Sequence, residues 1–123
     1  MDQCELPGYF RLAKNVSKHS THRYKLGAVL VDGSRVISMG YNQCKSNPNA
    51  PWVGMHAEAN AIRLSGKKEI KGSSIFVYRE TRRGKIAMAR PCKNCQEVLR
   101  LFGIKFMYYS TSEYPFWNVE KLI

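Results

Sequence analysis

Two short segments of the sequence carry side chains suited to a transition metal, His56-Ala57-Glu58 and Pro91-Cys92-Lys93-Asn94-Cys95. One imidazole and two thiols can serve as three protein ligands of Zn²⁺, which leaves a fourth tetrahedral position open for water, as in catalytic zinc sites. The spacing of Cys92 and Cys95 lets both sulfurs reach one metal from a single helical turn. A fold that uses all three ligands has to bring these two segments together, and Glu58 with them.

The residues around these segments predict alternating helices and strands. Apolar residues favour helices over residues 6–20 and 56–65, and Pro91 suits the first turn of a helix over 91–102. Short apolar runs predict strands over 26–31, 35–41, 74–78 and 104–109, and Asp32-Gly33 predicts the turn between the first two. We expect a loop over 42–54, an irregular basic segment over 80–90 and a short terminal helix over 116–122.

This order of elements predicts an α/β fold, a three-layer α/β/α sandwich with a small mixed β-sheet. A hairpin followed by strand–helix–strand crossovers gives mixed strand pairing with helices on the sheet faces. The length is that of one domain, residues 1–123. Both metal-binding segments would begin helices, where the helix dipole stabilises thiolates at Cys92 and Cys95.

The chain is strongly basic, with a formal net charge of +11. Such a charge favours anionic partners, either a nucleotide phosphate or a nucleic-acid backbone, although any one Lys or Arg is most often solvated surface. Three clusters supply most of the charge: Arg11, Lys14, Lys18, Arg23 and Lys25; Arg63, Lys67, Lys68 and Lys71; and Arg79, Arg82, Arg83, Lys85 and Arg90.

The composition and the N-terminal residues indicate the cellular compartment to expect. No apolar run approaches the roughly 20 residues that a membrane helix needs. The N-terminus lacks the basic start and apolar core of a secretory signal, so we expect a cytoplasmic protein with reduced cysteines. Cys4 and Cys44 are then expected to be ordinary buried or half-buried thiols.

The donor set fits hydrolytic deamination, in which oxygen replaces an exocyclic amine. Zn²⁺ lowers the pKa of bound water from about 15.7 to around 7, which would provide a zinc-bound hydroxide as nucleophile. Glu58 would take the proton and return it to the ring and then to the leaving amine. Backbone N–H groups beside Ala57 and Cys92 could orient the base, because first-turn N–H groups lack helical partners.

The main alternative to a catalytic zinc site is a structural zinc site. It would be closed by Cys92, Cys95 and two of His56, Cys4 or Cys44. A lone P-C-x-x-C could also be a dithiol redox site. Neither alternative gives Glu58 a role. Each of the two motifs begins a predicted helix, and a predicted strand lies between them in the sequence, so together they indicate a catalytic site.

The pairing of H-x-E with P-C-x-x-C resembles the zinc-dependent cytidine and deoxycytidylate deaminase superfamily, most of all the phage-type dCMP deaminases. The stretches that carry the resemblance include Gly27-Ala28-Val29-Leu30-Val31, Gly40-Tyr41-Asn42 and His56-Ala57-Glu58-Ala59-Asn60-Ala61-Ile62. The resemblance implies that His56, Cys92 and Cys95 bind zinc and that Glu58 is the proton shuttle. It further implies that Asn42 hydrogen-bonds the sugar and that Ala57 contacts the pyrimidine through its backbone.

The sequence departs from the family pattern in three places. The loop between Asn42 and His56 is short, which puts regulation by deoxynucleoside triphosphates in doubt. The segment over 80–90 is longer and more basic than usual. The chain ends soon after the strand over 104–109, so we expect a small sheet with an edge covered by another subunit, in a homo-oligomer.

The resulting hypothesis is deamination of a cytosine nucleotide, dCMP to dUMP. Candidate contacts to the phosphate are Arg23, Lys25 and Arg90, and Tyr114 resembles a substrate-binding tyrosine of dCMP deaminases, although it could equally be a packing residue. One alternative is a polynucleotide deaminase, in which Trp52 stacks a base and the Arg79–Arg90 segment forms a basic groove. A free nucleoside deaminase and a zinc-stabilised binding module remain open.

Overall fold

The computed structural model describes residues 7–20, 24–44, 54–66 and 70–123 of the chain. These residues form a six-stranded mixed sheet whose strand order is β2-β1-β5-β7-β8. The strands are β1 (Lys25–Asp32), β2 (Arg35–Tyr41), β5 (Ser74–Glu80), β6 (Ile86–Ala87), β7 (Phe106–Ser110) and β8 (Trp117–Lys121), with β6 paired to β5. Only β5 and β7 pair in parallel within this sheet.

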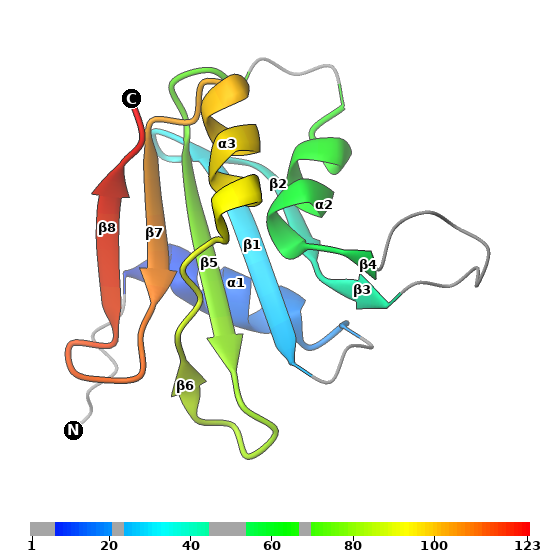
Figure 1. Cartoon of the computed structure of the whole chain (residues 1–123), viewed down its shortest axis with the longest axis vertical. Helices are drawn as coiled ribbons and strands as arrows, with labels where there is room; N and C mark the ends of the chain where they lie inside the picture. Colours follow the sequence, from blue (N-terminus) through cyan, green and yellow to red (C-terminus); the bar gives the residue numbers. More distant parts are fainter. Residues whose placement is uncertain (1–6, 21–23, 45–53, 67–69) are drawn as a thin grey trace.

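Helices cover both faces of the sheet. They are α1 (Gly8–Ser17), α2 (Ala57–Leu64) and α3 (Lys93–Leu101), and a separate two-stranded ribbon of β3 (Gln43–Cys44) and β4 (Gly54–Met55) leads into α2. Figure 1 shows α1 behind the sheet and α2 with α3 in front of it. The predicted three-layer α/β/α arrangement with a mixed sheet is therefore confirmed. None of the helices in the described residues is long and apolar enough to cross a membrane.

The alternation of side chains along the central strands divides the core into two layers. In β1, Ala28 and Leu30 pack with α2 and α3, whereas Val29 and Val31 pack with α1. Because both faces are covered, β1 is apolar at successive positions, which is why it appears in the sequence as a continuous apolar run.

The hairpin of β1 and β2 has the predicted second strand but a turn shifted by one residue. Asp32 pairs with Arg35, which places Gly33 and Ser34 in the turn in place of Asp32-Gly33. Gly33 has a φ of 63°, a conformation that glycine adopts without steric cost.

The segment over 80–90 is more ordered than predicted. β5 continues to Glu80, the chain reverses at Gly84, and β6 pairs back with β5. The amide of Thr81 donates to the carbonyl of Lys85 (2.8 Å), which closes the turn. The basic residues around this turn hid a short hairpin, because charge alone says little about backbone pairing. We refer to residues 80–87 as the basic hairpin.

The prediction of a terminal helix over 116–122 is wrong. The chain reverses after β7 and returns as β8, antiparallel to it. Trp117 packs against Tyr108 (6.0 Å between ring centroids) and Phe10 (6.4 Å), contacts that a short terminal helix would lose. The outer edge of β7 is thus covered by this chain's own β8.

Two strand glycines let helices lie unusually close to the sheet. A Cβ at Gly27 would come within 2.0 Å of the Ala13 carbonyl oxygen in α1. A Cβ at Gly40 would come within 2.4 Å of the Ala61 nitrogen and 2.9 Å of the Ala57 carbonyl oxygen in α2. Both neighbours are backbone, so they cannot swing away as a flexible side chain would.

Gly40→Ala should therefore destabilise the protein by about 1–3 kcal/mol, as overpacking of a tight core does. The free energy of unfolding, measured by urea denaturation, checks this. Gly8→Ala is the matched control, because a Cβ at Gly8 in α1 meets nothing within 4 Å. We expect that control to be neutral or slightly stabilising. Equal stability of Gly40→Ala and the wild type would show that α2 can move without cost.

Candidate metal centre and active site

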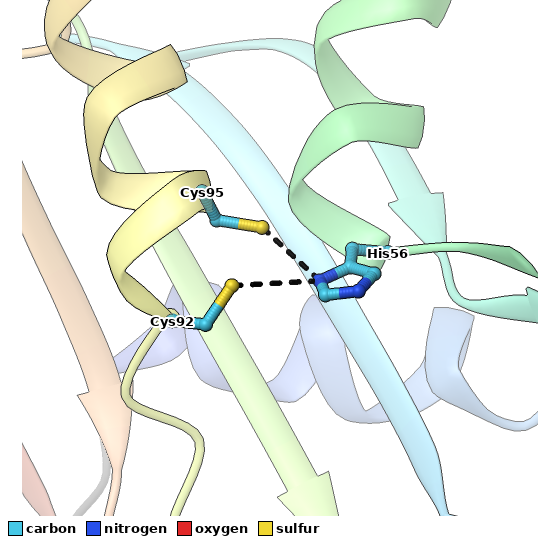
Figure 2. Close-up of side chains that lie close together, drawn as sticks. All are labelled: His56, Cys92 and Cys95. Carbon is cyan, nitrogen blue, oxygen red and sulfur yellow. Dashed lines mark hydrogen bonds between the residues drawn. The ribbon is translucent and has the colours of Figure 1, made fainter. Parts of the chain in front are cut away.

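His56, Cys92 and Cys95 come together in the fold, as the sequence predicts. The Nδ1 atom of His56 lies 3.1 Å from the sulfur of Cys95 and 3.9 Å from that of Cys92. All three candidate ligand atoms lie within 4.8 Å of one another. Figure 2 shows both sulfurs directed at the same ring nitrogen. Standard zinc bond lengths at tetrahedral angles require nitrogen–sulfur separations of about 3.5 Å, so the cluster fits Zn²⁺ with little adjustment.

The ligands come from the N-terminal ends of two helices. His56 is the N-cap residue of α2, and Cys92 is the N-cap residue of α3, both with extended backbone. The predicted start of α3 at Pro91 is therefore close, since the helix proper begins at Lys93. Cys95 lies in the first turn of α3, so both sulfurs sit near the positive end of the same helix dipole. This position favours thiolates, which are the form of cysteine that binds metals.

Glu58 lies in the first turn of α2, two residues after His56, and its side chain is buried with 4% exposure. Burial raises its pKa, and a hydrogen bond from its own backbone and the nearby His56 offset this only in part. A buried carboxyl with a raised pKa binds a proton more readily than an exposed one, so it can accept a proton and later donate it. The position and environment of Glu58 are those expected of a proton carrier beside the cluster.

The electrostatics of the cluster also favour a cation. Burial raises the pKa of the Cys95 thiol, and the neighbouring Glu58 and Cys92 raise it further. Two sulfurs, a ring nitrogen and a buried carboxyl thus converge on one small site. A metal ion bound between the sulfurs would reverse this penalty, because it stabilises both thiolates.

Asn42 is buried, but its side chain has an architectural role that the sequence did not reveal. Its carboxamide oxygen accepts hydrogen bonds from the Leu26 amide (2.9 Å) and the Ser20 hydroxyl (2.6 Å). Its nitrogen donates to the Tyr24 carbonyl (2.6 Å). These bonds fix the start of β1 to the end of β2. Ala57 is fully buried at the start of α2, next to both His56 and Glu58.

The remaining candidate substrate contacts differ in their surroundings. Lys25 is exposed at the start of β1, and Tyr114 is 81% exposed in the turn between β7 and β8. Arg90 is occupied by an ion pair with Glu120. Several residues lie outside the described part of the chain: Cys4, Arg23 and Trp52, together with the side chain of Cys44.

An ionic clamp that sequence reasoning missed holds the segment before α3. The Arg90 guanidinium donates twice to the Glu120 carboxylate in β8, at 2.7 and 3.0 Å. The hydroxyl of Tyr109 donates to the same carboxylate at 2.5 Å. Arg90 immediately precedes Pro91 and Cys92, so the clamp ties the thiol-bearing turn to the edge of the sheet. The pairing of Arg90 with Glu120 could not be predicted, because Glu120 belongs to a strand that the sequence analysis expected to be a helix.

Comparison with known proteins agrees with the geometry. The sequence model described as the cytidine and deoxycytidylate deaminase zinc-binding region matches residues 5–111. The chain belongs to this family. The family is defined by the zinc-binding region of deaminases, which are hydrolases, and His56, Cys92 and Cys95 are positioned as possible ligands of that zinc.

Two similar sequences within the family are deoxycytidylate deaminases. The protein from Schizosaccharomyces pombe is 27% identical over 125 aligned positions, which cover 85% of this chain and 36% of that protein. The deaminase of Mycobacterium phage D29 is 27% identical over 110 positions, 71% of this chain and 78% of the relative. The chain thus spans about a third of the yeast protein and most of the phage protein.

Solved structures confirm the cytidine-deaminase-like fold. The dCMP deaminase of cyanophage S-TIM5 superposes with a TM-score of 0.67 at 24% identity, covering 87% of this chain and 82% of that one. Cytidine deaminase from Burkholderia pseudomallei superposes with a TM-score of 0.69 at 20% identity, covering 95% and 94%. At these identities the likeness is one of fold.

The purified chain should contain one zinc ion. Removal of a residue that only supports a metal ligand lowers metal affinity by roughly 10–100-fold. Cys92→Ser or His56→Ala removes a ligand itself, so each should lower zinc affinity by more than this. Metal content by mass spectrometry and competition with a chelator check this. The double variant Cys4→Ser/Cys44→Ser is the control and should keep its zinc. Loss of zinc from that control would indicate a closed site with four protein ligands.

The clamp should make stability depend on pH. The Arg90 guanidinium and the Tyr109 hydroxyl lower the pKa of Glu120 to about 2 from its usual value of 4.5. A lowered pKa contributes stability above pH 4.5 that is lost as the pH falls toward 2. Glu120→Gln should therefore be less stable than the wild type at pH 7, and the difference in unfolding free energy should shrink between pH 4.5 and 2. Glu113→Gln, at an exposed position, should show no such trend.

Proposed function

We propose that the chain catalyses hydrolytic deamination of dCMP to dUMP. The observation that carries the proposal is a buried carboxyl, Glu58, in the same helical turn as one ligand of a three-ligand zinc cluster. Three protein ligands leave one tetrahedral position for a reacting group, as in catalytic zinc sites. Bound Zn²⁺ would supply a Lewis acid that lowers the pKa of water from about 15.7 toward neutrality.

Glu58 would move the protons of the reaction. It would accept one from the attacking water, deliver it to the ring nitrogen N3, and then help protonate the amine that leaves as ammonia. Water and dCMP are consumed, and dUMP and ammonia are formed. The raised pKa of Glu58 supports this role, because a carboxyl that binds a proton more readily can both take the proton and return it.

The relatives support cytosine nucleotides as the substrate class. The similar proteins from Schizosaccharomyces pombe and phage D29 are named deoxycytidylate deaminases. A structure of the cyanophage S-TIM5 dCMP deaminase in complex with dCMP and dUMP superposes on this chain with a TM-score of 0.64. For this chain the substrate remains our proposal.

Substrate contacts would come from the edges of the same site. Ala57 would present its backbone to the pyrimidine. Asn42 would contact the sugar through its carboxamide, which also keeps its hydrogen bonds to Leu26, Ser20 and Tyr24. Lys25 and Arg23 are candidate contacts to the phosphate, and Tyr114 is a candidate contact to the substrate. A phosphate that used Arg90 would have to compete with Glu120 for the guanidinium, so Arg90 is better placed to hold Cys92 in position than to bind substrate.

The positions of three cations in the segment over 79–90 favour a mononucleotide over a polynucleotide substrate. Arg79 donates to the Met88 carbonyl and lies over the Tyr24 ring, and Arg90 pairs with Glu120. Lys85 lines the side of the sheet that faces α1. The three cations therefore do not form one open track into the metal centre.

We also propose that the protein works as a homo-oligomer in the cytoplasm. Apolar side chains are exposed along α3 and at its C-terminal end, with Val98, Leu101 and Phe102 exposed by 39%, 83% and 46%. An apolar helix surface of this kind favours contact with another protein surface.

A panel of substrates tests the proposal most simply. Zinc-loaded protein should deaminate dCMP with a higher kcat/KM than deoxycytidine, cytidine, cytosine or a short single-stranded oligonucleotide. A higher kcat/KM on deoxycytidine would mean that the pocket takes a nucleoside, and a higher value on the oligonucleotide would make the enzyme a polynucleotide deaminase. Absence of turnover with every compound would favour a structural zinc module.

Glu58→Gln should reduce kcat for dCMP by about 10²–10⁴-fold, the usual contribution of general acid–base catalysis, while zinc content stays at the wild-type level. The amide keeps the shape of the side chain but cannot carry the proton. Glu113→Gln is the matched control and should leave kcat unchanged, because Glu113 is exposed in the turn between β7 and β8. Undiminished turnover by Glu58→Gln would remove Glu58 from the mechanism.

A further inference from the structure

A basic groove lies on the face of the sheet opposite the metal centre. It is an open hollow of ≈ 850 Å³ between α1, the basic hairpin and the turn that joins β7 to β8. The metal ligands belong to α2 and α3, which cover the other face of the sheet (Figure 1). The lining of the groove is therefore separate from the metal centre, and the proposed function gives none of the lining residues a role.

The fold brings together cations from two basic clusters that are far apart in the sequence. Arg11, Lys14 and Lys18 line one side from α1, and Lys85 lines the other side from the basic hairpin. All four are exposed. None of the described residues that line the groove is an aspartate or glutamate. The lining therefore carries a net positive charge, which is offset in part by Glu80, whose carboxylate accepts a hydrogen bond from the lining residue Tyr78 (2.8 Å).

The cations of α1 form a row. Spacings of three and four residues place Arg11, Lys14 and Lys18 on one side of the helix. The row extends for about 10 Å along the helix axis, at 1.5 Å per residue. A single phosphate would be held best by donors that converge on one point. A row of cations suits an anion with several charges along its length.

Aromatic rings border the same groove. Phe116 is half-buried in its lining, and the ring of Tyr114 meets that of Phe116 edge-on with centroids 6.1 Å apart. Tyr114 is 81% exposed, so one face of its ring is accessible. A row of cations beside an exposed aromatic ring is the combination by which proteins hold single-stranded nucleic acids, through phosphates and stacked bases respectively.

We propose that this groove binds a single strand of nucleic acid. The phosphates contact the cations of α1 and Lys85, and a base stacks on Tyr114. Tyr114 is also a candidate substrate contact, but none of the cations that line the groove is. Binding of phosphates to these cations is therefore independent of deamination, because the cations and the metal centre lie on opposite faces of the sheet. The net charge of +11 supports the association through the general attraction of polyanions.

Binding of a fluorescently labelled oligo-dT of about 15 nucleotides to the zinc-loaded full chain tests the proposal, with anisotropy measured over a series of salt concentrations. Lys14→Glu/Lys18→Glu should weaken binding by on the order of tenfold at low salt. The same variant should flatten the dependence of log K on log salt by about 1.4, or 0.7 for each lost phosphate contact. Tyr114→Ala should weaken binding by about fivefold or more without changing the salt slope.

The control has the same change in charge at positions outside the groove. Arg35→Glu/Lys121→Glu should retain binding within about twofold to threefold, because neither residue lines the groove. An equal loss in both double variants, or no binding by the wild type, overturns the proposal. Displacement of the oligonucleotide by inorganic phosphate or free dCMP at comparable concentration also overturns it, in favour of a small-anion site.

Turnover of dCMP separates this proposal from the proposed function. Lys14→Glu/Lys18→Glu should deaminate dCMP at the wild-type rate while its oligonucleotide binding falls. A parallel loss of both properties would mean that the groove is part of the substrate path, and the claim of an independent site would fail. Failure of the chain to turn over dCMP would leave the binding measurement unaffected.

Discussion

The position of the metal centre depends on how closely α2 can approach the sheet. Gly40 in β2 has no side chain, and the α2 backbone fills the space that a Cβ would occupy. Two hydrogen bonds fix the same contact, from Ser38 to the Ala61 carbonyl (2.7 Å) and from Asn60 to the Tyr41 carbonyl (3.1 Å). Because α2 is fixed to β2 in this way, the side chains at its N-terminus have a defined place. His56 and Glu58 are those side chains.

The second half of the site is fixed from the opposite edge of the sheet. The Ala89 amide bonds to the Ser110 carbonyl (2.9 Å), and Arg90 is held by Glu120. The turn that carries Cys92 is therefore anchored before α3 begins. Two helix N-termini then face each other, and their positive dipole ends help to offset the cost of a buried carboxyl and two converging thiols. A cation bound between the donor atoms would complete this balance, because it would stabilise both thiolates.

The local chemistry of the site could be predicted from sequence, but its long-range supports could not. His56, Cys92 and Cys95 were identifiable because ligand type and spacing restrict the possible chemistry, and Gly66 and Gly103, with φ of 68° and 80°, follow helices that were predicted. β8 was missed because its stabilisation comes from pairing with β7 and packing on Phe10, which no local pattern records. The bonds of Asn42 and the pairing of Arg90 with Glu120 join distant residues, so they were equally hidden.

We propose that His56, Cys92 and Cys95 are the complete protein ligand set of an open, catalytic zinc site. X-ray absorption spectroscopy at the zinc edge tests this directly on the purified chain. We expect two sulfurs at about 2.3 Å and two lighter atoms at about 2.0–2.1 Å, one from histidine and one from water. Three or four sulfurs, or two histidine nitrogens beside two sulfurs, would contradict it, because either result would close the position that deamination requires.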